Sequence, residues 1–171
     1  MKATEDYVSF ETAKALRAIG FNCPCCHYYK RSKWVRRGRF PSKKISPQMY
    51  KGYADLIKEA PKIEFINDEG ITNQRLTGNE SPRMDWADEF VMPHYEYATA
   101  PTLWQAQKWL REVHNIDMNV DLDDETDEPY NVEIYRNKQC VVGHWELGFF
   151  STYEQALSKG IETAIKVIEE V

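Results

Sequence analysis

The sequence predicts an α+β fold: an antiparallel sheet, at least a three-stranded meander, with helices packed on one face. Three short runs, at residues 118–122, 131–136 and 139–147, mix hydrophobic and polar residues as neighbouring strands of one sheet do. Segments with helical periodicity lie before and after these runs, at residues 102–114 and 151–168. The order helix, three strands, helix allows both helices to cover the same side of the sheet.

A further helix is expected near the start of the chain, between Ser9 and Gly20. Its apolar side chains recur at helical spacing: Phe10, Ala13, Leu16 and Ile19. Ser9 is a good N-cap residue, and Gly20 is the expected terminator because glycine adopts the left-handed conformation without strain. The cysteine-rich residues 23–26 are therefore placed on a turn.

The two later helices each begin with a predicted capping box. Thr102 and Gln105 open the first, and Ser151 and Glu154 open the second. The expected buried stripes are Leu103, Ala106, Leu110 and Val113 on the first helix, and Tyr153, Ala156, Leu157, Ile161, Ala164, Ile165 and Ile168 on the second.

Residues 27–37 are expected to form a strand, and residues 38–98 a loop-rich segment that contains one short strand at residues 62–66. With 171 residues, of which 42% are hydrophobic and 29% charged, the chain suits a single domain over residues 1–171.

Cytoplasm is the expected compartment. No run of about 18 apolar residues is present to span a bilayer, and the acidic start MKATEDYVSFETAK lacks the apolar core of a signal peptide. We therefore expect no membrane partner, and cysteines that stay reduced.

Charge is distributed unevenly along the chain, whose net charge is −5. Residues 12–54 hold eleven basic residues and no acidic one, whereas residues 55–171 hold 10 basic and 24 acidic residues. This asymmetry indicates either an anionic partner for the basic part or two oppositely charged surfaces that meet within the fold or across a homo-oligomer.

The basic segment at residues 30–44 is one candidate binding site. Its charged residues alternate with aromatic ones, and both types are typical of surfaces that bind phosphates and bases; they include Lys30, Arg31, Lys33, Trp34, Arg36, Arg37 and Arg39. The alternatives are a solvated edge strand and a patch that faces a second copy.

The cysteine-rich turn is the other candidate, as a zinc site. The residues of metal-binding type are Cys23, Cys25, Cys26, His27, Cys140 and His144. Cys140 and His144 would share a face if residues 139–147 formed a regular strand. However, the spacing C-P-C-C is tighter than usual for zinc, and buried cysteines also act as small apolar residues. We therefore expect no cofactor, with zinc as the alternative.

No motif predicts catalysis. The sequence contains neither a glycine-rich phosphate loop nor a nucleophile elbow. His114 is expected to stabilise a helix end as a cation. The alternative is a small enzyme acting on a phosphoester or nucleotide through His144 and neighbouring acids such as Glu146.

Three stretches resemble a family of small uncharacterised proteins from gut bacteria, their phages and prophages: SFETAKALRAIGF, APTLWQAQKWLREVHNIDMNV and FFSTYEQALSKGIETAIKVIEE. The resemblance covers residues 7–29 and 98–171 and brings no activity, cofactor or catalytic residue. It implies an accessory protein of a mobile element. We therefore expect a non-enzymatic protein that binds a macromolecular or small anionic partner, with nucleic acid as an alternative.

Overall fold

The computed structural model describes residues 6–36, 62–65, 68–74, 91–123 and 127–170. The chain divides into two compact units. We call Met1–Asn22 with Ala100–Val171 the terminal unit, and Cys23–Thr99 the central unit. The interpretation of residues 1–171 as one domain stays a prediction, because two compact units can fold together.

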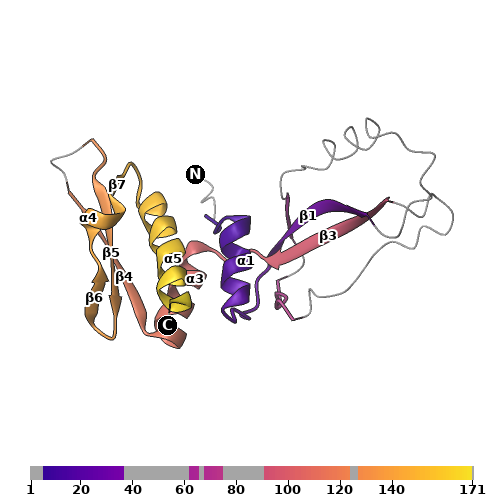
Figure 1. The fold of residues 1–171 in the computed structure, drawn as a ribbon, viewed down its shortest axis with the longest axis horizontal. Helices are drawn as coiled ribbons and strands as arrows, with labels where there is room; N and C mark the ends of the chain where they lie inside the picture. Colours follow the sequence, from indigo (N-terminus) through magenta and orange to yellow (C-terminus); the bar gives the residue numbers. More distant parts are fainter. Residues whose placement is uncertain (1–5, 37–61, 66–67, 75–90, 124–126, 171) are drawn as a thin grey trace. The chain divides into compact units, whose positions relative to one another are not determined.

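The terminal unit has the predicted α+β architecture (Figure 1). Its sheet has the order β4-β5-β6, all antiparallel, with the short β7 also paired to β5. Its elements are α1 (Phe10–Ala18), α3 (Leu103–His114), β4 (Ile116–Leu122), β5 (Tyr130–Arg136), β6 (Gln139–Val142), α4 (His144–Leu147), β7 (Phe149–Phe150) and α5 (Tyr153–Glu169). Helices α3 and α5 pack on one face of the sheet, as expected.

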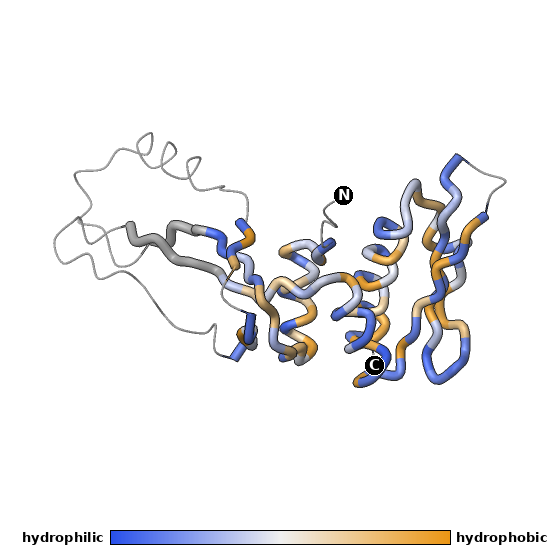
Figure 2. The backbone as a smooth tube through the Cα atoms, turned by 180° about the vertical axis from the view of Figure 1, so that it is seen from behind, coloured by the Kyte–Doolittle hydropathy of each residue, from blue (hydrophilic) through white to orange (hydrophobic). Residues whose placement is uncertain are grey.

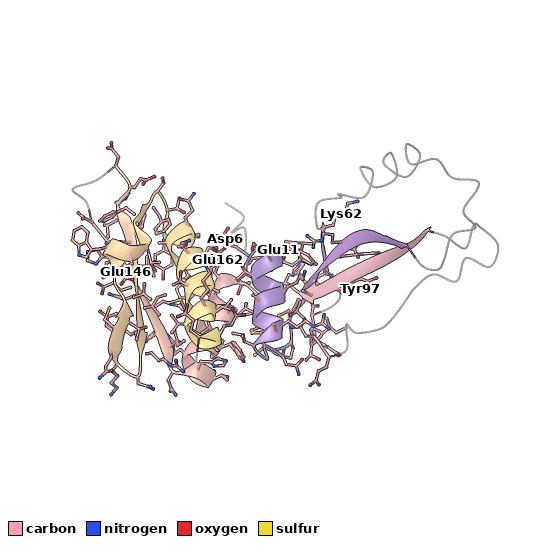
Figure 3. The ribbon with its side chains drawn as sticks, in the orientation of Figure 1. Asp6, Glu11, Lys62, Tyr97, Glu146 and Glu162 are labelled. Atoms are coloured by element: carbon pink, nitrogen blue, oxygen red, sulfur yellow. The ribbon has the colours of Figure 1, made fainter. Side chains whose placement is uncertain are left out.

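The core of this unit lies between α5, α3 and the sheet. Strand residues Met118, Val132 and Ile134 are buried beneath helix residues such as Leu110 and Ile161. Figure 2 shows hydrophobic residues recurring along α1 and α5, where these helices pack together. At their contact, the hydroxyl of Thr12 donates to Glu162 at 3.4 Å (Glu162 is labelled in Figure 3).

The predicted ends of α1 are confirmed. The Ser9 side chain accepts from the Thr12 amide at 3.1 Å. At the other end Gly20 has a φ of +100°, and the Phe21 amide bonds to the Leu16 carbonyl at 2.9 Å. This is the Schellman pattern, in which the residues at its two ends, Leu16 and Phe21, are both buried.

The capping box of α3 is also confirmed, but two details of the later helices were wrong. Val113 is 56% exposed, because the buried face of α3 ends at Leu110. Helix α5 is capped by Thr152, whose hydroxyl accepts from the Gln155 amide at 3.2 Å. Ser151 does not cap it; its hydroxyl instead donates to Glu128.

The central unit contains a three-stranded antiparallel sheet with the order β2-β1-β3. Strand β1 (His27–Arg36) confirms the strand expected at residues 27–37, and β2 (Lys62–Phe65) the one at 62–66. Strand β3 (Val91–Thr99) was not predicted, because Pro93 was taken as a breaker. It is one of the two edge strands of this sheet, where proline is tolerated. Other parts of the segment expected to be loop-rich lie outside the described residues.

A bridge between Cys25 and Ile71 fixes the cysteine-rich turn within the central unit. Their backbones exchange hydrogen bonds of 3.0 and 2.8 Å. Gly70 precedes Ile71 with a φ of +76°, and a Cβ there would lie 3.0–3.2 Å from Pro24 and Cys25. Only glycine satisfies both the conformation and this close approach.

In the described part of the chain, no helix combines the length and the apolar character that crossing a membrane requires.

Candidate functional site

The register of β4 and β5 brings a row of polar residues onto the sheet face that points away from α5. Asp117 lies opposite Tyr135, Asn119 opposite Glu133, and Asp121 opposite Asn131. The alternate residues of both strands, such as Met118 and Ile134, are buried under the helices. Because side chains alternate along a strand, the polar set shares the outer face.

Glu133 connects two neighbours on this face. Its carboxylate accepts a hydrogen bond of 2.6 Å from the Tyr135 hydroxyl, and it lies 2.9 Å from Nδ1 of His144. The bond from Tyr135, followed by the one from His144, lowers the pKa of Glu133. The same bond to Glu133 raises the pKa of Tyr135 to about 12. Near neutral pH the Glu133 carboxyl is therefore ionised. The Tyr135 phenol stays neutral.

A polar hollow lies at one end of the same face, with a volume of about 660 Å³. Its lining comes from the end of α3, from β4 and β5, and from the turn that follows β5: Arg111, Asn115, Asp117, Met118, Asn119, Tyr135, Asn137 and Lys138. We call it the amide hollow, because three of these residues are asparagines. They can both donate and accept hydrogen bonds.

Two left-handed residues form the turn that brings Lys138 to the amide hollow. Asn137 and Lys138 have φ values of 51° and 67°, as a two-residue hairpin turn requires. Arg111 also lines the hollow. Its Nη1 lies 3.8 Å from the Asp117 carboxylate, whose Oδ1 also accepts from the Met118 amide. Asp117 is therefore held by the backbone and orients Arg111 without a tight ion pair.

A group of aromatic residues, of which Trp145 is exposed, lies at the other end of the outer face. Trp145 on α4 is 81% exposed, and its ring lies 4.4 Å from that of His144 and 6.3 Å from that of Phe149. Figure 3 labels the neighbouring Glu146 on α4, on the side of the sheet away from α5. Glu146 caps α4 through the Gly143 amide, and it is Glu133 that pairs with His144.

The structure corrects the expectation that Cys140 and His144 share a strand face. Strand β6 ends at Val142, and Gly143 begins the short helix α4, so residues 139–147 are not a regular strand. Cys140 is exposed, and its thiol points to the Val142 carbonyl at 3.6 Å. His144 is engaged by Glu133.

His114 also differs from expectation. It ends α3, but burial and the charge of Arg136 lower the pKa of its ring. The ring packs edge-on against Trp109 at 4.8 Å. The neutral form is therefore favoured, and the expected cation at this helix end was wrong.

The three cysteines of the cysteine-rich turn differ in exposure and in hydrogen-bond partner. Cys25 is buried, whereas Cys23 and Cys26 are partly exposed; the Cys25 thiol points to the Cys23 carbonyl and the Cys26 thiol to the Asp68 carbonyl. Among the described residues, no group of three or more histidines, cysteines or carboxylates is arranged to hold a metal ion. A low zinc content of the purified protein stays a prediction.

We expect the four thiols to differ in their reaction with iodoacetamide at about pH 8. Burial raises the pKa of Cys25 to about 11, so that little thiolate forms and access is poor. Cys140 should react first and Cys25 last, as followed by peptide mass spectrometry over time. All four should react alike in urea; equal rates in the folded protein would contradict the buried position of Cys25.

The basic segment is described only in part. Lys30 and Arg31 are half-buried on β1, where Arg31 lies opposite Glu96 of β3 in the strand register. The backbone of β1 also contains Lys33, Trp34 and Arg36. Arg37 and Arg39 lie outside the described residues.

A comparison of the chain with protein-family models, curated proteins and solved structures found no significant match.

Glu133→Gln is expected to make stability less dependent on pH in the acid range. A carboxyl with a lowered pKa stabilises the fold above its unfolded pKa, near 4.5, and this stabilisation is lost as the pH falls through the folded pKa. The wild-type free energy of unfolding should therefore fall more than that of the variant between about pH 6 and about pH 3, in urea titrations. Glu112→Gln, at an exposed carboxylate of α3, is the control. Parallel curves for wild type and Glu133→Gln would contradict the network.

Proposed function

We propose that the protein is a non-enzymatic, cytoplasmic accessory protein of the phage or prophage type that binds a small organic anion in the amide hollow. The observation that carries the proposal is the pair of cations, Arg111 and Lys138, that flank the hollow. They stand out because the terminal unit has 9 basic and 17 acidic residues, a net charge of −8.

The chemistry of the lining favours an anion with further polar groups. Arg111 presents a planar set of donors that matches a carboxylate or phosphate, and Lys138 supplies a second positive charge. The amides of Asn115, Asn119 and Asn137 can donate to the anion or accept from hydroxyl groups. The Asp117 carboxylate and the negative end of α3 offset part of this positive charge.

The size of the hollow argues for an organic molecule over an inorganic ion. Its volume of about 660 Å³ lies within the range of about 300–1,000 Å³ common for small-molecule sites. A lone phosphate would leave much of the asparagine lining in contact with water only. A phosphorylated or carboxylated sugar has both the charge and the hydroxyl groups that this lining can bind.

The test compares ribose 5-phosphate with ribose and inorganic phosphate by isothermal titration calorimetry at low salt. We expect ribose 5-phosphate to bind more tightly than either part alone. Arg111→Ala and Lys138→Ala should each weaken binding about tenfold or more, as expected for hydrogen bonds to charged groups. Lys166→Ala, an exposed cation of α5, is the matched control.

Two results would overturn the proposal. One is a ribose 5-phosphate affinity that neither Arg111→Ala nor Lys138→Ala changes. The other is the absence of saturable binding across a panel of sugar phosphates and hydroxy acids at low salt.

A second candidate, nucleic-acid binding, is favoured by the placing of Lys30, Arg31, Lys33 and Arg36 along the single strand β1. Titration with labelled single-stranded and duplex oligonucleotides tests it. Affinity should fall steeply with salt, and the double substitution Arg36→Ala with Arg37→Ala should weaken all sequences alike and reduce the salt dependence. The absence of binding at low salt would exclude this candidate.

A further inference from the structure

A second hollow, of about 270 Å³, lies in the terminal unit where the first turns of α3 and α5 meet the segment before α1. It is lined by Asp6, Thr102, Leu103, Trp104, Tyr153, Glu154 and Leu157. Backbone bonds fix the segment that contributes Asp6, which Figure 3 labels: the Leu103 amide donates to the Asp6 carbonyl at 2.9 Å, and Tyr7 bridges to Thr102.

Aromatic rings form one wall of this hollow. Trp104 stacks on Tyr153 with a centroid distance of 6.1 Å and an angle of 22°, and Tyr130 meets Tyr153 edge-on at 6.3 Å. Trp104 is nevertheless 65% exposed. A fixed indole with an open surface is available to a ligand.

The charged groups of the hollow are all negative. Asp6 and Glu154 are exposed carboxylates, and none of the seven lining residues is basic. Glu154 follows Tyr153 in the sequence, and burial, followed by the charge of Glu154, raises the pKa of Tyr153. Carboxylates beside aromatic faces form the environment that attracts organic cations.

Helix capping does not explain all the residues that line this hollow. Acidic residues at a helix start are stabilising in themselves, and Asp6 and Glu154 lie near two such starts. The caps of both helices are already supplied by Thr102 and Thr152. Neither role requires an exposed tryptophan stacked on the tyrosine of another helix.

We infer that this hollow binds an organic ammonium group. The alkyl part of the cation packs on the faces of Trp104 and Tyr153, and Asp6 and Glu154 provide the opposite charge. The site is separate from the amide hollow and differs from it in the sign of the ligand's charge.

The test uses choline and its uncharged carbon isostere, 3,3-dimethylbutan-1-ol, followed through the indole N–H signal of Trp104 in NMR titrations. We expect a saturable shift with choline and at least about fivefold weaker binding of the isostere, because the two differ only in charge. Trp104→Ala should weaken choline binding by a similar factor, Trp104→Phe less, and Asp6→Asn should weaken choline but not the isostere. Trp145→Ala, which removes an exposed tryptophan elsewhere, should leave choline binding unchanged.

A lysine peptide and its acetylated form distinguish the two sources of an ammonium group. Tighter binding of the lysine peptide than of choline identifies a protein side chain as the ligand, whereas weaker binding identifies a small amine. Equal affinities for choline and its isostere in the wild-type protein, or no saturable shift of the Trp104 signal, would overturn the inference even if the variants fail to fold.

Discussion

Leu110→Ala should lower the free energy of unfolding by about 2–5 kcal/mol, the range for buried leucines whose cavity does not close. Leu110 is fully buried on α3, among the largest such side chains of the terminal unit. Truncation removes its contacts and leaves a void, because close-packed neighbours relax only in part. Urea unfolding followed by far-ultraviolet circular dichroism measures the difference.

Leu122→Ala makes the same chemical change at an exposed position. Leu122 is 64% exposed on β4, so its truncation should cost less than about 1 kcal/mol. Equal losses for the two variants would show that α3 does not pack as described.

Gly160→Val should destabilise the terminal unit by about 1–3 kcal/mol or more, by overpacking. A Cβ at Gly160 would lie 3.0 Å from Cγ2 of Val132 and 3.2 Å from the sulfur of Met118. Valine adds two further methyl groups at this close contact between α5 and the sheet, so helix and sheet must separate. Thermal unfolding at matched protein concentration is the measurement.

Gly143→Val is the control for this substitution. Gly143 has an extended backbone, and nothing lies within 4 Å of the Cβ position. Its melting temperature should stay close to that of the wild type. A Gly160→Val variant as stable as Gly143→Val would contradict the close contact between α5 and the sheet.

Most elements of the terminal unit were predictable because their signals are local. The period of the apolar residues, the Thr102 and Gln105 pair and Gly20 each act within a few residues. Strand β3 was missed because Pro93 breaks an inner strand but not an edge strand, and sequence alone does not say which strands lie at the edge.

The amide hollow could not be predicted in the same way. The alternation in β4 and β5 indicates that Asp117 and Tyr135 are outward-facing, but their pairing depends on the register of two strands. Arg111 reaches the hollow from a different element, α3. His144 shows the same limit: its partner, Glu133, is eleven residues away, whereas sequence proximity suggested Glu146.

The division of the terminal unit into two separate stretches has a consequence for how the chain folds. Its two parts, Met1–Asn22 and Ala100–Val171, are joined only through the 77 residues from Cys23 to Thr99. Contacts such as Val8 with Pro101 and Phe21 with Trp109 therefore form only after a long loop has closed. Replacing the intervening residues by a linker of about ten would reduce the entropy cost of closure by about 2 kcal/mol. We therefore expect the docking of α1 to be the slow, non-local step of folding for this unit, whereas α3, the sheet and α5 can assemble from residues close in sequence.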